Sequence, residues 1–131
     1  MTINIAMLIL SLVLLQLFQF LQGAHLGKIA GNAYNLSPRD KPVDLGLMGG
    51  RIQRAKVNLI ENLVVFAPLS ILAEVTHASP ATVSWGAIIF FVARIVHAVT
   101  YLAGIAVLRT LAWLAGVIGC VVVGLAVVGW G

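Results

Sequence analysis

Four long apolar stretches dominate the chain, and their length constrains the fold more than any other feature. A helix needs about 20 mainly apolar residues to cross the hydrocarbon core of a bilayer, and 131 residues hold four such segments and little else. Only 9% of the residues are charged, whereas soluble domains carry about 25%. The mean hydropathy is +1.07. The sequence therefore predicts one all-α membrane domain over residues 1–131, a bundle of four transmembrane helices.

We expect the four spans at residues 3–28, 51–75, 81–106 and 109–130. The connection over residues 31–50 is rich in Gly, Pro, Asn and Asp, which are turn-forming and helix-breaking residues. Small residues recur every fourth position in the last span, a pattern that allows close helix packing: Ala112, Gly116, Cys120 and Gly124. In the first span a glutamine recurs every third position, at Gln16, Gln19 and Gln22, so one face of this helix is polar.

The positive charge is concentrated around the first connection. Six of the eight Lys and Arg residues lie within or beside it: Lys28, Arg39, Lys41, Arg51, Arg54 and Lys56. The positive-inside rule then predicts that this connection is cytoplasmic and that both termini lie on the opposite side. The net charge of +4 is thus explained by membrane orientation, and no basic patch with interleaved aromatic residues predicts nucleic-acid binding. One cysteine and three dispersed histidines predict no metal site.

Two of the apolar spans carry polar residues at helical spacing. Arg54, Asn58 and Glu61 follow an i, i+4, i+7 pattern, and Arg94, His97 and Tyr101 follow an i, i+3, i+7 pattern. Each set therefore lies on one face of a helix. A charged side chain at the bilayer centre costs about 2.5–3.5 kcal/mol on insertion scales, so such groups face protein, ligand or water. The two stripes predict a polar pocket inside the bundle.

The residue types suggest what this pocket binds. Arg51 and Arg109 add two more guanidinium groups at the same end of the bundle, and arginine pairs well with carboxylates. Glu61 is suited to an amine. These residues favour a small ligand with several carboxylates and an amino group. A structural network, in which Arg54 or Arg94 pairs with Glu61, explains the same residues equally well.

The sequence resembles the family of membrane-associated proteins in eicosanoid and glutathione metabolism. Residues 51–61, RIQRAKVNLIE, look like the family signature R-x-x-R-A-x-x-N-x-x-E. Residues 93–102, ARIVHAVTYL, are similar to the A-R-x-x-H-x-x-x-Y segment of its prostaglandin E synthase branch. Arg109 stands where the family has an arginine at the start of the fourth helix. The resemblance covers nearly the whole chain.

The resemblance implies a homotrimer of four-helix subunits that binds glutathione between neighbours, near the cytoplasmic side. Arg54, Asn58 and Glu61 match positions that contact glutathione or support those contacts. Arg94, His97 and Tyr101 match the pocket wall on the third helix. Arg109 matches the arginine proposed to stabilise the glutathione thiolate, and Tyr101 is a second candidate for a thiol partner.

We therefore expect a glutathione-dependent membrane transferase that conjugates or reduces apolar electrophiles entering from the bilayer. Peroxidase activity is an open alternative reaction. A non-enzymatic membrane protein that retains the fold is the first alternative function. A small four-helix multidrug exporter is the second, and it is disfavoured because such exporters depend on a carboxylate in the first helix, where this chain has no Asp or Glu.

Overall fold

The computed structural model describes residues 1–130, and its regular structure is entirely helical within that range. The elements are α1 (Ile3–Ala30), α2 (Asn32–Asn35), α3 (Gly46–Val75), α4 (Pro80–Ala103) and α5 (Ala106–Val127). The long helices α1, α3, α4 and α5 are each long and apolar enough to cross a membrane. The fold is therefore an all-α bundle of four membrane-spanning helices, as the apolar stretches predict, and the chain is an integral, multi-pass membrane protein.

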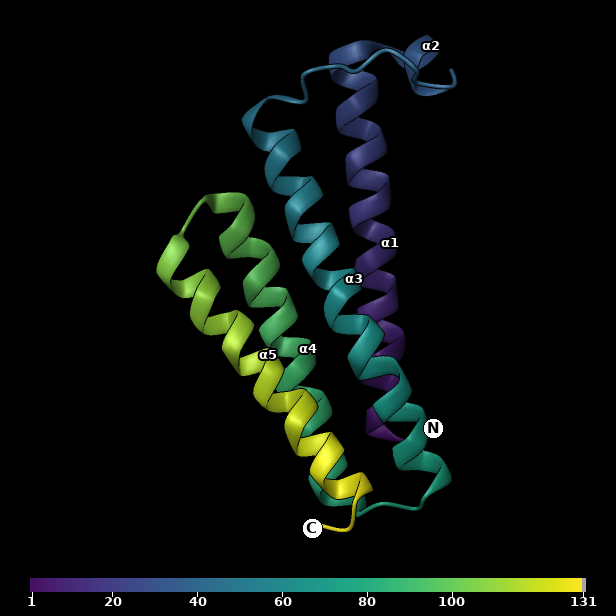
Figure 1. Ribbon diagram of the computed structural model, residues 1–131, viewed down its shortest axis with the longest axis vertical. Coiled ribbons are helices and arrows are strands. Elements are labelled where there is room, and N and C mark those ends of the chain that lie inside the picture. The colour runs from purple at the N-terminus through teal and green to yellow at the C-terminus, as the bar shows by residue number, and fades with distance from the viewer. Residues whose placement is uncertain (131) are drawn as a thin grey trace.

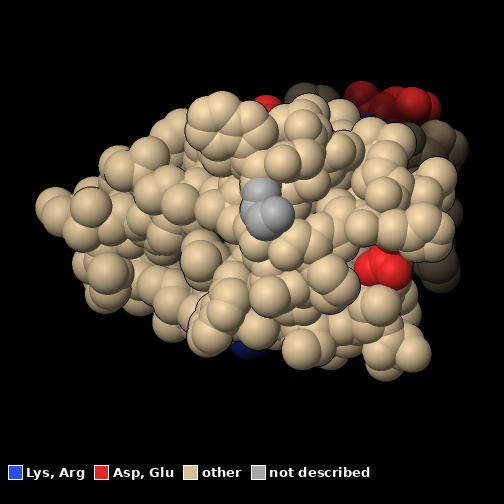
Figure 2. All heavy atoms as spheres, turned by 90° about the horizontal axis from the view of Figure 1, so that it is seen from below, with Lys and Arg blue, Asp and Glu red and all other residues tan. Residues whose placement is uncertain are grey.

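The two ends of the bundle differ in character. Both termini and the α3–α4 turn lie at one end, while α2 and the connection into α3 lie at the other (Figure 1). Seen from the end with the termini, the surface is almost entirely uncharged (Figure 2). The charge asymmetry of the sequence thus becomes an asymmetry between the two ends of the molecule.

The helix boundaries differ from the expected spans at the connections. α3 begins at Gly46, five residues before the expected start, and the Asp44 carboxylate accepts a hydrogen bond from the Gly46 amide at 2.8 Å. The short helix α2 lies in the same connection, so the irregular segment is shorter than expected. α4 ends at Ala103 because Gly104 adopts a left-handed conformation with φ of 78°. α5 begins three residues before the expected start, at Ala106.

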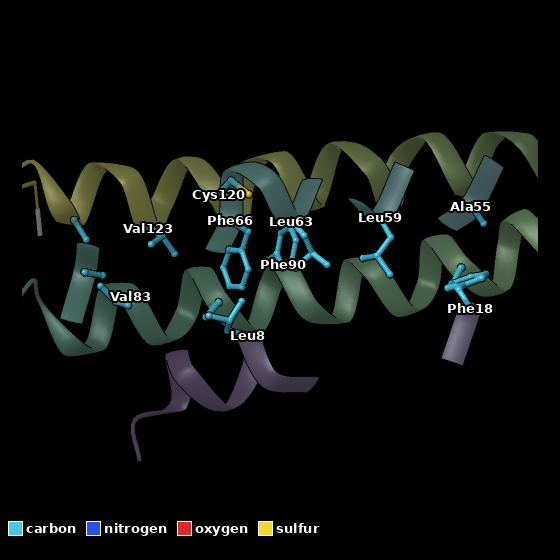
Figure 3. Packing of buried hydrophobic residues seen from close by; sticks show 14 of the residues in the cluster. Leu8, Phe18, Ala55, Leu59, Leu63, Phe66, Val83, Phe90, Cys120 and Val123 are labelled. Atoms are coloured by element: carbon cyan, nitrogen blue, oxygen red, sulfur yellow. The ribbon is translucent and has the colours of Figure 1, made fainter. Parts of the chain in front are cut away.

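Aromatic stacking and glycine contacts hold the core together. Phe66 of α3 stacks on Phe90 of α4 with ring centroids 3.9 Å apart, and both side chains are fully buried (Figure 3). α4 and α5 approach each other closely at Gly86 and Gly119, where a Cβ on Gly119 would lie 2.7 Å from the Gly86 carbonyl oxygen. The small residues of α5 therefore bring its backbone against α4, and Cys120 is buried beside them.

Candidate functional site

Arg94 is the most deeply buried charged residue of the bundle, with only 2% of its surface exposed. Its Nη1 donates to Asn58 Oδ1 of α3 at 3.1 Å, and its Nη2 donates to the carbonyl oxygens of Ala112 and Trp113 of α5, each at 3.2 Å. Gly116 makes room for it, because a Cβ at this position would lie 2.8 Å from the guanidinium carbon. Arg94 therefore joins α3, α4 and α5 without a carboxylate partner among residues 1–130.

Asn58 is the residue of α3 that meets this guanidinium. Its backbone carbonyl accepts a hydrogen bond from Asn62 Nδ2 at 2.7 Å, one turn further along the helix. The i, i+4 spacing puts both amides on the same face. The Asn58 side-chain oxygen accepts from Arg94 Nη1 and also lies 3.4 Å from Asn62 Nδ2. Neither Arg94 nor Arg54 forms an ion pair with Glu61 among residues 1–130. For Arg94, the carboxylate partner considered from the sequence is replaced by the Asn58 amide.

A second cluster lies where α4 meets α5. The rings of His97 and Tyr101, one helical turn apart, make an edge-to-face contact with centroids 5.4 Å apart. The guanidinium carbon of Arg109, in the first turn of α5, lies 4.8 Å from the Tyr101 ring centroid. His97 is 5% exposed, whereas Tyr101 and Arg109 are half-buried. The aromatic ring thus contacts the cation at the start of α5, and both residues are partly accessible.

Arg51 of α3 also reaches this end of α4. Its Nη1 donates to the carbonyl oxygen of Leu102 at 3.1 Å. The absence of a side chain at Gly104 is needed here, because a Cβ would lie 2.8 Å from the Arg51 guanidinium carbon. Arg51 and Arg109 therefore contact neighbouring residues in the last turn of α4, Leu102 and Tyr101.

Arg54 and Glu61 are exposed on the outer surface of the single chain. The Arg54 guanidinium lies along the backbone of its own helix, 3.0 Å from the Cβ position of Gly50. Glu61 lines the polar end of a groove between α3 and α5, with a volume of about 450 Å³. Trp113 lines the same groove, and Cys120 lies along its apolar part.

The structure thus separates the candidate residues into three sets. Arg94 and Asn58 form the first set, a buried contact. The second set lies at the last turns of α4, which carry His97 and Tyr101 and are contacted by Arg51 and Arg109. The third set, Arg54 and Glu61, faces outward. Two supporting glycines, Gly116 and Gly104, were not predicted as part of the site. In the sequence, Gly116 stands out only as one member of the small-residue pattern of the last span. Gly104 was expected inside a helix. No group of three or more metal-ligating side chains occurs within residues 1–130.

The fold and this arrangement define a four-helix integral membrane protein with arginines gathered at one end of the bundle. The MAPEG family model matches residues 4–129, and the chain belongs to this family. The match therefore extends over all four membrane-spanning helices and includes every candidate residue. A search of curated proteins found no match.

Proposed function

We propose that the protein is a glutathione-dependent membrane transferase acting on apolar electrophiles. The observation that carries this proposal is that two arginines contact the last turn of α4, Arg51 at the Leu102 carbonyl and Arg109 at the Tyr101 ring. Membership of the MAPEG family supports it, since members generally use glutathione. Peroxidase activity would use the same thiol and is included in the proposal.

The chemistry of the available donors fits glutathione. Glutathione carries two carboxylates, one amino group and one thiol. Arg51, Arg54 and Arg109 form no ion pair within residues 1–130, so their guanidinium groups are available for anionic groups. Glu61 is exposed and unpaired in the same range and could accept the amino group. Arg94 differs from these because its donors are directed to Asn58 and to α5. We therefore assign Arg94 a supporting role in the pocket.

Arg109 is the residue we assign to thiol activation. A free thiol has a pKa of about 8.5 and is mostly protonated at neutral pH, and glutathione supplies this thiol as the nucleophile when it is bound. A guanidinium in a partly buried position stabilises a neighbouring anion, because water screens the charge only in part. Tyr101 contacts Arg109 through its ring, and its hydroxyl is the second candidate donor to the thiol. His97 supports the Tyr101 ring from the buried side.

The apolar groove between α3 and α5 is the proposed route for the electrophile. It has a volume of about 450 Å³, and its lining is apolar except near Glu61 and Asn62. Trp113 lies along it and follows Ala112, whose carbonyl binds Arg94. An apolar electrophile dissolved in the bilayer could enter this groove from the side.

The proposed assembly is a homotrimer with glutathione bound between subunits. Arg54 and Glu61 are exposed in the single chain although they lie on a membrane-spanning helix, and such groups need protein or water around them. A neighbouring subunit would cover them. In the proposed orientation, residues 31–45 are cytoplasmic and both termini lie on the opposite side, because the basic residues gather around that connection.

Turnover of a chromogenic electrophile tests the proposed activity. Purified protein in detergent would be mixed with glutathione and a chloronitrobenzene, and the conjugate followed by its absorbance. We expect conjugation above the uncatalysed rate, and a strong loss in Arg109→Ala. Saturable glutathione binding without turnover of chloronitrobenzenes or organic peroxides would favour the non-enzymatic alternative. Absence of glutathione binding by folded protein would contradict the proposal.

A further inference from the structure

A small cavity lies at the end of the bundle that carries both termini, opposite the end where the arginines gather (Figure 1). Its volume is about 250 Å³. The start of α1, the end of α3, the following turn and the start of α4 line it with polar side chains: Thr2, Asn4, Glu74, His77 and Ser84. It shares no lining residue with the groove proposed for the electrophile, so it is a separate space.

Hydrogen bonds hold the walls of this cavity in a defined arrangement. Thr2 Oγ1 donates to Glu74 Oε1 at 2.6 Å, and Asn4 Nδ2 donates to the same oxygen at 3.0 Å. Asn4 Nδ2 also donates to the Ser70 carbonyl at 2.9 Å. In the turn after α3, His77 has φ of 51°, and its amide donates to the Glu74 carbonyl at 3.3 Å. The Glu74 carboxylate therefore connects the start of α1 to the end of α3.

Several oxygens at this cavity retain acceptor capacity within residues 1–130. Asn4 is 1% exposed, and its Nδ2 faces two acceptors, which fixes the orientation of the amide and leaves Oδ1 unpaired. Both donors to Glu74 reach Oε1, so Oε2 accepts no hydrogen bond. Ser84 Oγ donates to the Pro80 carbonyl at 2.6 Å and keeps its lone pairs. Buried acceptors without donors are unfavourable, so the cavity favours a ligand with several donors.

The charge around the cavity is negative and unbalanced. Glu74 is the only acidic residue in its lining, and no Lys or Arg lines it. Residues 1–27 and 57–93, which include all its walls, contain no Lys or Arg, and Glu74 forms no ion pair within residues 1–130. The rest of the surface at this end is almost uncharged (Figure 2). A ligand with one positive charge would therefore balance the carboxylate.

We propose that this cavity binds a primary ammonium group, either of an ethanolamine lipid head group or of a small free amine. A primary ammonium carries one positive charge and three N–H donors, which matches one carboxylate and the acceptors Glu74 Oε2, Asn4 Oδ1 and Ser84 Oγ. Trp85, next to Ser84, is 66% exposed, and Val75, next to Glu74, is 69% exposed. An exposed tryptophan near the end of a membrane-spanning helix is typical of the bilayer interface, where lipid head groups lie.

Calorimetric titration with three probes tests the proposal on purified protein in a maltoside detergent, which has no ammonium group. The first probe is ethanolamine. The second is dihexanoyl phosphatidylethanolamine, a soluble short-chain lipid. The third is dihexanoyl phosphatidylcholine, which has the same phosphate and acyl chains but a trimethylammonium group without N–H donors.

The pattern of binding separates the two sources. Saturable binding of both ethanolamine probes supports an ammonium site that needs no acyl chain. Binding of the ethanolamine lipid alone supports a lipid head-group site, and binding of ethanolamine alone supports a site for a free amine. Binding of neither ethanolamine probe to folded protein, or equal affinity for the choline lipid, overturns the proposal.

Side-chain variants show whether the binding uses this cavity. We expect Glu74→Gln, which removes the charge and keeps the shape, to weaken the affinity for the bound ethanolamine probe about tenfold or more. Ser84→Ala should weaken it about threefold while leaving the hydrogen bonds of Glu74 in place. Parental affinity in folded Glu74→Gln overturns the assignment. If Glu74→Gln does not fold, Ser84→Ala decides, and parental affinity there overturns it.

Glu61→Gln is the matched control. It removes the same charge from the same helix, about 20 Å away along α3 and outside the cavity lining, and it should change the affinity for the ethanolamine probe less than about twofold. A loss in Glu61→Gln equal to that in Glu74→Gln overturns the assignment. Glutathione affinity should show the reverse pattern, falling in Glu61→Gln and staying parental in the two cavity variants. Thermal unfolding of each variant verifies its fold.

Discussion

The guanidinium of Arg94 occupies the space that a side chain at position 116 would require. Arg94 lies on α4 and Gly116 on α5, and a Cβ on Gly116 would come within 2.8 Å of the guanidinium carbon. The missing side chain lets Arg94 reach the Ala112 and Trp113 carbonyls. The small-residue pattern of α5 therefore serves two purposes, close helix packing and accommodation of a buried cation.

We predict that Gly116→Ala destabilises the bundle. The added methyl group would displace Arg94 from its acceptors, and overpacking of a core site costs about 1–3 kcal/mol. Thermal unfolding in mild detergent would measure the effect. Gly124→Ala is the matched control on the same helix, because the nearest atoms to its Cβ position are 3.8 Å away. Alanine is there expected to be neutral or to stabilise, by about 0.5–1 kcal/mol, through its higher helix propensity. Equal stability of the two variants would contradict the Arg94–Gly116 relationship.

We predict an energetic coupling between Arg94 and Asn58. Asn58→Ala removes the acceptor of Nη1, and leaving a buried donor unpaired costs about 1–3 kcal/mol. Arg94→Leu removes the donor instead, so Asn58→Ala should cost less in that background. A double-mutant cycle of unfolding free energies measures the difference, and directly contacting residues typically couple by about 0.5–3 kcal/mol. Strict additivity would show that the 3.1 Å contact makes no contribution to stability.

The sequence was sufficient to predict the membrane fold because its signals are local. Long apolar stretches specify the spans, and helical spacing put Asn58 and Arg94 on faces that could meet. The partner of Arg94 could not be predicted, because that choice depends on the relative rotation of α3, α4 and α5. A carboxylate pairing with Glu61 was an equally reasonable expectation from residue types.

Two further features could not be predicted from the sequence alone: the start of α3 and the outward-facing positions of Arg54 and Glu61. Gly46–Gly50 look like a helix-breaking segment, yet Asp44 accepts a hydrogen bond from the Gly46 amide and the helix starts there. Arg54 and Glu61 share a helical stripe with Asn58, but the stripe is wide enough for its edges to face outward. Where those edges point depends on contacts beyond the single chain.

We predict that residues 31–45 and the chain termini lie on opposite sides of the membrane. A cysteine introduced at Ser37 should react with an impermeant thiol reagent from the cytoplasmic side, since the basic residues flank this segment. A cysteine in a C-terminal extension should react only from the other side. Cys120 is buried and should contribute little background. Labelling of both positions from the same side would contradict this orientation.

We predict that the functional unit is a trimer. The exposure of Arg54 and Glu61 on a membrane-spanning helix requires a protein or aqueous neighbour, and a second subunit would provide one. Native mass spectrometry from mild detergent should give three chains per particle. Retention of glutathione affinity by a stable monomer would exclude a site between subunits.

Glutathione bound to the protein should be ionised, and Arg109 should be the residue responsible. The ultraviolet absorbance of the thiolate, recorded as a difference spectrum during a glutathione titration, measures this most directly. We predict a saturable thiolate signal in the parent protein, a strong loss in Arg109→Ala, and partial retention in Arg109→Lys, which keeps the charge but not the planar fork. Calorimetry on the same samples should show that affinity falls less than the signal. A full thiolate signal in Arg109→Ala, or none in folded parent protein at saturating glutathione, would contradict the proposed activation of the thiol.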